Sequence, residues 1–230
     1  MSLSRMPDGI VFDMDGLLFD SEALYRDAAR AAAAEAGRDL PDAVFASLVG
    51  GVWPDNRARL LAHFGEDFAV DAYQAEWMRH YAARAADGPA LKPGVREMLV
   101  LLDGLGLKRA IATSSSHEAV QRNLAAHGLA GCFDAVVARG DYARGKPAPD
   151  PFLRAADRLG VAADGCLALE DSPHGVRSAS AAGMVVVMVP DLVPASAADH
   201  HLCAFVAADL HDVVRAIGAL GAGAASRHSR

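Results

Sequence analysis

The sequence Gly9-Ile10-Val11-Phe12-Asp13-Met14-Asp15-Gly16 sets the architecture expected for this 230-residue chain. A short apolar run that stops at polar residues and glycine is typical of a buried strand followed by a turn. Because side chains alternate along an extended segment, Asp13 and Asp15 can point to the same side. Two acids that end a buried strand are energetically costly without a function, so this sequence also indicates a site.

The chain that follows Pro93-Gly94 alternates strands and helices. Strands are expected at residues 109–112, 133–138, 166–169 and 184–189, with an edge strand at 203–206. Helices are expected at 95–102, 118–127, 150–159, 173–182 and 209–220. This alternation predicts an α/β fold, in which helices cover both faces of a parallel sheet. The Gly/Ala/Ser-rich tail from Gly221 is expected to be disordered.

A segment of different composition separates the first strand from this alternating region. Helices are expected at 22–36, 42–49, 54–64 and 71–86, with breaks at Gly50-Gly51 and Gly65. We find no convincing strand pattern between Phe19 and Pro89. The sequence therefore predicts two domains. They are an α/β core formed by residues 1–19 and 88–230, and an inserted all-helical domain at 20–87.

Composition and charge narrow the class of protein. Hydrophobic residues make up 52% of the chain, which is ample for a packed core, and the formal net charge is -7. An acidic chain without a basic patch predicts no nucleic-acid or anionic-membrane partner. The three cysteines lie far apart, which excludes a disulfide framework and a structural zinc site and fits a reducing compartment. Without a recognisable signal peptide or membrane-spanning apolar stretch, the expected location is the cytoplasm.

Polar residues follow three of the expected strands at the point where each strand ends. They are Asp13 and Asp15, Thr113 and Ser114, and Glu170 and Asp171, and Lys146 lies in the loop at 139–150. Parallel sheets bind ligands at the carboxyl ends of their strands, so these groups should meet there. Several acids around one point need a cation, and oxygen ligands without histidine or cysteine favour Mg²⁺ over zinc. A phosphate ester is the expected companion of that ion.

These residues resemble the four motifs of the haloacid-dehalogenase-like hydrolase superfamily. The matching motifs are Asp13-Met14-Asp15-Gly16, Thr113, Lys146-Pro147 and Glu170-Asp171-Ser172. The helical insertion is similar to the small α-helical cap of the β-phosphoglucomutase and phosphoglycolate-phosphatase branch. The resemblance covers the chain from about Asp8 to Leu220, and it implies a Rossmann-like core with an inserted cap domain. Dehalogenating members lack the second aspartate of the first motif, so the presence of Asp15 implies phosphoryl transfer.

The resemblance also implies a role for each motif residue. Asp13 would be the nucleophile that forms an aspartyl-phosphate, and Asp15 would be the general acid and base. Mg²⁺ would be held by Asp13, the Asp15 backbone carbonyl and Asp171, and Glu170 would support this ligand shell. Phosphate oxygens would be bound by Thr113, Ser114 and Lys146.

The expected reaction is Mg²⁺-dependent hydrolysis of a small phosphorylated metabolite, such as a sugar phosphate or phosphoglycolate. A sugar-phosphate mutase is the first alternative, although its cap has an arginine and a histidine at positions that fall near Trp53 and Tyr25 here. A catalytically inactive binding protein is the second, although such a protein would be expected to lose a motif residue. The residues predicted to face the leaving group of the substrate are Tyr25, Trp53, Arg57 and Arg79. A monomer is the default expectation.

Overall fold

The structure, a computed structural model, describes residues 2–49 and 53–225. Within this part of the chain there are two compact units. The core unit consists of Met1–Phe19 and Leu91–Arg230, and the helical unit is the inserted segment Asp20–Ala90. The sequence placed the second boundary between residues 87 and 88. The break expected at Gly50-Gly51 lies outside the described residues.

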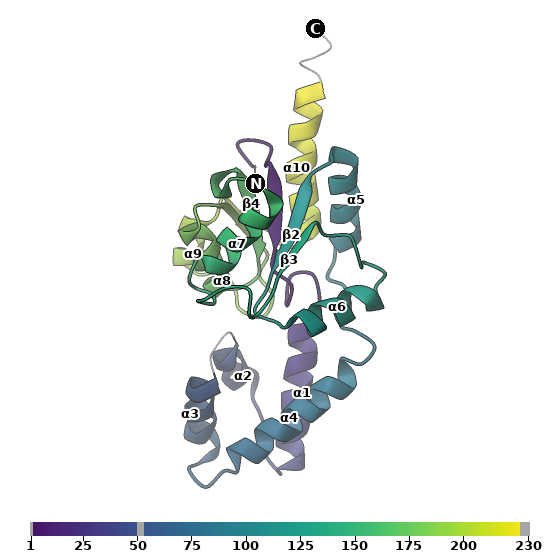
Figure 1. The fold of residues 1–230 in the computed structure, drawn as a ribbon. Coiled ribbons are helices and arrows are strands. Elements are labelled where there is room, and N and C mark those ends of the chain that lie inside the picture. Colours follow the sequence, from purple (N-terminus) through teal and green to yellow (C-terminus); the bar gives the residue numbers. More distant parts are fainter. Residues whose placement is uncertain (1, 50–52, 226–230) are drawn as a thin grey trace. The chain divides into compact units, whose positions relative to one another are not determined.

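The core unit is built on a six-stranded sheet with the strand order β3-β2-β1-β4-β5-β6 (Figure 1). Its strands are β1 (Gly9–Phe12), β2 (Lys108–Ala112), β3 (Ala135–Val137), β4 (Cys166–Glu170), β5 (Val185–Met188) and β6 (Phe205–Val206). All neighbouring strands are parallel, and Phe12 of β1 is in register with Ile111 of β2 and Leu169 of β4. The predicted α/β fold with a parallel sheet is confirmed, and the loops that follow β1, β2 and β4 begin at adjacent positions.

Helices cover both faces of this sheet (Figure 1). They are α5 (Val95–Leu105), α6 (His117–Ala126), α7 (Asp150–Leu159), α8 (Pro173–Ala181), α9 (Ala197–Leu202) and α10 (Leu210–Ala225), with a short 3₁₀ turn at Ala163–Gly165. Successive side chains of β1 enter different cores because they point to opposite faces. Ile10 and Phe12 belong to the cluster that α5 and α10 complete, and Val11 belongs to the cluster of α7 and α8.

Serine side chains begin two helices that follow strands of the sheet. Ser116 accepts a hydrogen bond from the backbone N–H of Ala119 at 3.3 Å, at the start of α6. Ser172 accepts one from the N–H of Gly175 at 3.1 Å, at the start of α8. Each bond satisfies a backbone donor that the first turn of a helix leaves without a partner. The Ser172 cap thus starts α8 directly after the end of β4.

The last helix is longer than predicted. We expected it to end at Leu220, ahead of a disordered tail, but α10 continues to Ala225. Helices α5 and α7 end at Gly106 and Gly160 in the left-handed conformation, whereas Gly221 has no positive φ. A glycine that keeps helical angles weakens a helix without ending it, and the neighbouring alanines favour the helix. The rest of the expected tail, residues 226–230, lies outside the described residues.

The helical unit contains α1 (Ser21–Glu35), α2 (Asp42–Leu48), α3 (Trp53–Phe64) and α4 (Val70–Arg84). Among its described residues there is no strand. Helices α1 and α4 pack side by side (Figure 1), and the small alanines of α1 are buried there. The Tyr73 hydroxyl donates to the Ala29 carbonyl at 3.1 Å, and Trp77 Nε1 donates to the Tyr25 carbonyl at 2.8 Å. In neither unit does the described part of the chain include a helix long and apolar enough to cross a membrane.

The chain leaves the core unit after Phe19 and returns to it at Leu91. These two residues pair in antiparallel orientation. The Lys92 N–H donates to the Leu18 carbonyl at 3.0 Å, and the Asp20 N–H donates to the Ala90 carbonyl at 2.8 Å. The two ends of the inserted segment are therefore adjacent and hydrogen-bonded to each other.

Candidate active site

Buried polar side chains lie at the carboxyl ends of β1, β2 and β4. Asp13, Thr113, Glu170 and Asp171 are each less than one-tenth exposed. Backbone hydrogen bonds continue past the strands, from the Asp13 N–H to the Leu169 carbonyl and from the Thr113 N–H to the Val137 carbonyl, each at 2.9 Å. The positions of these side chains are therefore set by the register of the sheet.

Lys146 reaches this group from the loop between β3 and α7. Its ammonium group forms ion pairs with Asp13 Oδ1 and with Glu170 Oε1, the latter at 2.6 Å, and the side chain is only 7% exposed. Burial opposes the charged form of Lys146, but the two carboxylates outweigh it and hold its pKa above the usual range. Burial raises the pKa of Asp13 to about 8, with Glu170 and Asp15 adding to the shift and Lys146 opposing it. Lys146 thus supplies positive charge to a cluster of acids.

The residues at the centre of this site fit a hard divalent cation. Asp13, Glu170 and Asp171 each offer a carboxylate oxygen, and these oxygens lie within 4.8 Å of one another. Carboxylate oxygens are the ligands that Mg²⁺ prefers, whereas zinc favours nitrogen and sulfur. A cation here would also stabilise the ionised form of the buried Asp13.

Glu170 is held in place by the chain that follows it. Its Oε2 accepts hydrogen bonds from the backbone N–H groups of Asp171 and Ser172, at 3.0 and 3.1 Å, and from the Ser172 hydroxyl at 3.0 Å. A Cβ atom on Gly175 would lie 1.7 Å from Glu170 Oε1. Only glycine therefore fits at this position of α8 while Glu170 keeps its place.

Asp15 is bound by two hydroxyl groups from the loop after β2. The Ser115 hydroxyl donates to Asp15 Oδ2 at 2.7 Å, and the Thr113 hydroxyl donates to the same oxygen at 3.4 Å. Ser115 was not among the predicted site residues. The alternation of side chains along an extended segment could have identified it, because residues 113 and 115 of such a segment point to the same side. Ser114, by the same rule, points elsewhere: it is exposed, and its backbone carbonyl accepts a hydrogen bond from Arg139 Nε at 3.2 Å.

The residues predicted to face the substrate lie in the helical unit. The Tyr25 ring lies 4.5 Å from the Trp77 ring and 5.3 Å from the Tyr81 ring, and burial raises the pKa of the Tyr25 hydroxyl to about 12. Trp53 is half-buried at the start of α3. Arg57 is exposed and pairs with Asp71 at 3.4 Å. The role of these residues toward a substrate stays a prediction.

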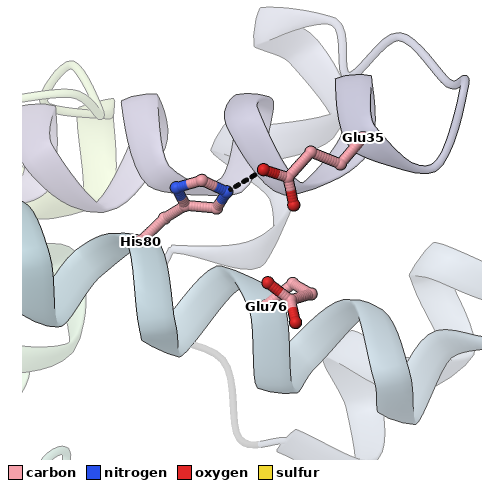
Figure 2. A group of neighbouring side chains, drawn as sticks. All are labelled: Glu35, Glu76 and His80. Carbon is pink, nitrogen blue, oxygen red and sulfur yellow. Dashed lines mark hydrogen bonds and ion pairs between the residues drawn. The ribbon is translucent and has the colours of Figure 1, made fainter.

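Arg79, the fourth of them, lies beside a group of side chains shared by α1 and α4. Glu35, Glu76 and His80 converge there (Figure 2), with ligand atoms within 4.8 Å of one another. His80 Nε2 lies 2.9 Å from Glu35 Oε1, and Arg79 approaches Glu76 at 2.5 Å and Glu35 at 3.3 Å. The guanidinium group already supplies the positive charge that these partly exposed carboxylates need, so we interpret the group as an ion-pair network.

A family model for haloacid dehalogenase-like hydrolases matches residues 7–183. The chain belongs to this family. It is 36% identical over 197 residues to the plasmid-encoded protein CbbY of Cupriavidus necator, covering 79% of this chain and 77% of the relative. It is 32% identical over 192 residues to the phosphoglycolate phosphatase of Rhodospirillum rubrum, covering 80% of each.

Solved structures agree with this membership. A haloacid dehalogenase-family hydrolase from Deinococcus radiodurans R1, with bound phosphate and sodium, superposes with a TM-score of 0.79 at 25% identity. The match covers 95% of this chain and 98% of that one. The resemblance inferred from the motifs is confirmed, and the chain is a phosphoric monoester hydrolase.

Proposed function

We propose that this haloacid dehalogenase-like hydrolase is a Mg²⁺-dependent phosphatase that acts on a small phosphorylated metabolite through an aspartyl-phosphate. The main support is the contact of Lys146 with both Asp13 and Glu170 inside the buried site. A buried lysine between two acids balances the charge of a nucleophilic carboxylate, and its ammonium group can also bind a phosphate oxygen.

The first half of the reaction transfers the phosphoryl group to the protein. An oxygen of Asp13 attacks phosphorus while the bond from phosphorus to the leaving oxygen breaks. Asp15, oriented by Ser115 and Thr113, gives its proton to that oxygen. Thr113 and Lys146 bind the non-bridging oxygens.

The second half releases phosphate and restores the enzyme. Asp15 takes a proton from a water molecule as the water oxygen attacks phosphorus and the bond to Asp13 breaks. Inorganic phosphate leaves, and Asp15 again carries the proton for the next cycle. Both halves depend on positioning and charge balance more than on new covalent chemistry.

The cation would be held by Asp13, Glu170 and Asp171, with the predicted backbone carbonyl of Asp15 as a further ligand. When bound, it would offset the charge on the transferring phosphoryl group. Burial raises the pKa of Asp13, with Glu170 and Asp15 adding to the shift, and a bound cation would favour the ionised form that acts as the nucleophile.

The substrate class is inferred from relatives that are named as phosphatases of small molecules. A sugar phosphate or phosphoglycolate is the first choice, because the phosphoglycolate phosphatase match covers most of both chains. Mutase activity is the alternative. Trp53 and Tyr25 stand near the positions where the mutase has its arginine and histidine, which favours hydrolysis.

The test is phosphate release from sugar phosphates, phosphoglycolate and a chromogenic aryl phosphate, with Mg²⁺ or with a chelator. Asp13→Asn should abolish turnover, and chelation should abolish it reversibly. The matched control is Asp157→Asn, which changes an exposed acid paired with Arg154 and should leave turnover unchanged. Conversion of glucose 1-phosphate to glucose 6-phosphate without free phosphate would instead establish the mutase. Turnover that survives in Asp13→Asn would refute the proposed nucleophile.

A further inference from the structure

A carboxylate that the motifs do not include lies next to the candidate cation site. Asp191 follows β5, the strand that pairs with β4 and places Met188 in register with Glu170. The Val189 N–H donates to the Glu170 carbonyl at 2.7 Å, so the two chain segments stay together beyond the sheet. Asp191 therefore leaves the sheet at the same edge as Asp171.

The two carboxylate oxygens of Asp191 have different surroundings. Oδ1 pairs with Lys92 Nζ at 2.6 Å, and the Asp191 side chain is only 9% exposed. Oδ2 is buried and has no hydrogen-bond partner among the described residues. A buried carboxylate oxygen without a partner is unfavourable, so such atoms are rare and call for an explanation.

The unpartnered oxygen lies on the side of Asp171, one of the predicted cation ligands. A Cβ atom on Gly16 would lie 2.4 Å from Asp171 Oδ2 and 3.4 Å from Asp191 Oδ2. Gly16 has a φ of +85° and stands in the turn that carries Asp13 and Asp15. The lack of a side chain on Gly16 thus lets both carboxylates approach this turn closely.

We propose that Asp191 is a positioning residue for the cation, and that its Oδ2 accepts a hydrogen bond from a water molecule bound to the cation. Mg²⁺ in proteins usually keeps several waters, and the partners of such ligands orient the whole shell. Contact through water fits because Asp191 is not part of the group whose oxygens lie within 4.8 Å of one another. Lys92 pairs with Oδ1, which leaves Oδ2 on the side of Gly16 and Asp171.

This inference rests on the proposed function. A direct measurement of Mg²⁺ binding distinguishes a failure of the inference from a failure of the proposed function. Isothermal titration of the substrate-free protein with Mg²⁺ should give about a ten-fold weaker affinity for Asp191→Asn than for wild type. The matched control is Asp103→Asn, which changes another acid paired with a cation at 2.6 Å, and it should bind Mg²⁺ as wild type does. The Mg²⁺ concentration for half-maximal phosphate release should rise by the same factor, while kcat at saturating Mg²⁺ stays within about three-fold. A merely structural role of Asp191 would not weaken Mg²⁺ binding while leaving kcat at saturating Mg²⁺ nearly unchanged.

Equal Mg²⁺ affinity in Asp191→Asn and wild type would overturn the role of Asp191 alone. Absence of Mg²⁺ binding by wild type, or wild-type affinity in Asp13→Asn, would overturn the proposed cation site as well. If Asp191→Asn does not fold, a crystal structure of the wild-type Mg²⁺ complex decides. A cation-bound water within hydrogen-bond distance of Asp191 is expected there, and its absence would contradict the proposal.

Discussion

Each unit of this protein contains a cluster of charged side chains, and the two clusters differ in their burial. In the core unit, Lys146 is buried against Asp13 and Glu170 at the end of the sheet. In the helical unit, Arg79 meets Glu35 and Glu76 in an exposed network. Burying a charged group is unfavourable unless partners of opposite charge compensate for its lost hydration. An exposed ion pair, in contrast, contributes only about 0–1 kcal/mol to stability. Of these two charged clusters, the buried one coincides with the candidate site.

The two units also differ in the kinds of side chain that fill their interiors. The sheet buries aliphatic side chains such as Ile10 and Val11, whereas the helical unit is centred on aromatic residues. Trp77 lies 4.5 Å from Tyr25, 6.2 Å from Phe45 and 5.7 Å from Tyr73, measured between ring centroids. Large rings bury much surface with few side chains, so the helical unit can be stable without a sheet.

The largest effect is expected from Lys146→Met. It removes the only ammonium group that contacts both Asp13 and Glu170 among the described residues, so kcat/KM for phosphate release should fall about 1000-fold. Lys108→Met, at a lysine that donates to the Leu159 carbonyl, is the matched control and should stay near wild type. A loss below ten-fold in Lys146→Met would mean that buried charge is a poor guide to this site.

Trp77→Ala should destabilise the protein by about 3–5 kcal/mol, because it removes a fully buried ring and a hydrogen bond to the Tyr25 carbonyl. Urea unfolding followed by circular dichroism measures this. If the aromatic cluster is the core of the helical unit, the loss should appear in a transition of that unit. A change under 1 kcal/mol would show that other contacts hold α1 to α4.

Gly175→Ala should lower kcat/KM about 100-fold, because the new methyl group must displace Glu170 from the cation site. Mg²⁺ affinity, measured by titration, should fall with it. The matched control is Gly218→Ala, where no neighbouring atom lies within 4 Å of the added Cβ. That variant should keep full activity and gain up to about 1 kcal/mol of stability, since alanine favours helices.

The smallest effect is expected from Arg79→Ala. Its partners are exposed, so the free energy of unfolding should stay close to that of wild type. The KM for phosphate release from small substrates tests the predicted contact of Arg79 with the leaving group. A change of KM by ten-fold or more would support that contact and contradict a purely structural network.

The fold of the core could be predicted because its signals are local. The buried run before Asp13, the cap Ser116 and the helix that opens with Pro173 each depend on a few neighbouring residues. The end of α10 could not, because glycine stops a helix only in the left-handed conformation, which composition does not reveal.

Some residues of the candidate site could be predicted from local sequence signals, and others could not. The acids at the ends of β1 and β4 stand out in the sequence because each follows an apolar run. Ser115 and Asp191 do not, because their partners come from residues 15 and 92, far away along the chain. Their contacts depend on strand register and on the rotamer of each side chain. The direction in which Tyr25 and Trp53 face is set by helix packing, which a period of hydrophobic residues does not specify.

The antiparallel pairing of Phe19 with Leu91 has an evolutionary consequence. A segment whose two ends already meet can change length at little entropic penalty, since loop closure depends only weakly on the number of residues enclosed. Recombination could therefore replace everything between these residues and leave the strand register of the sheet intact. One catalytic scaffold could in this way give rise to many specificities by exchange of a single module.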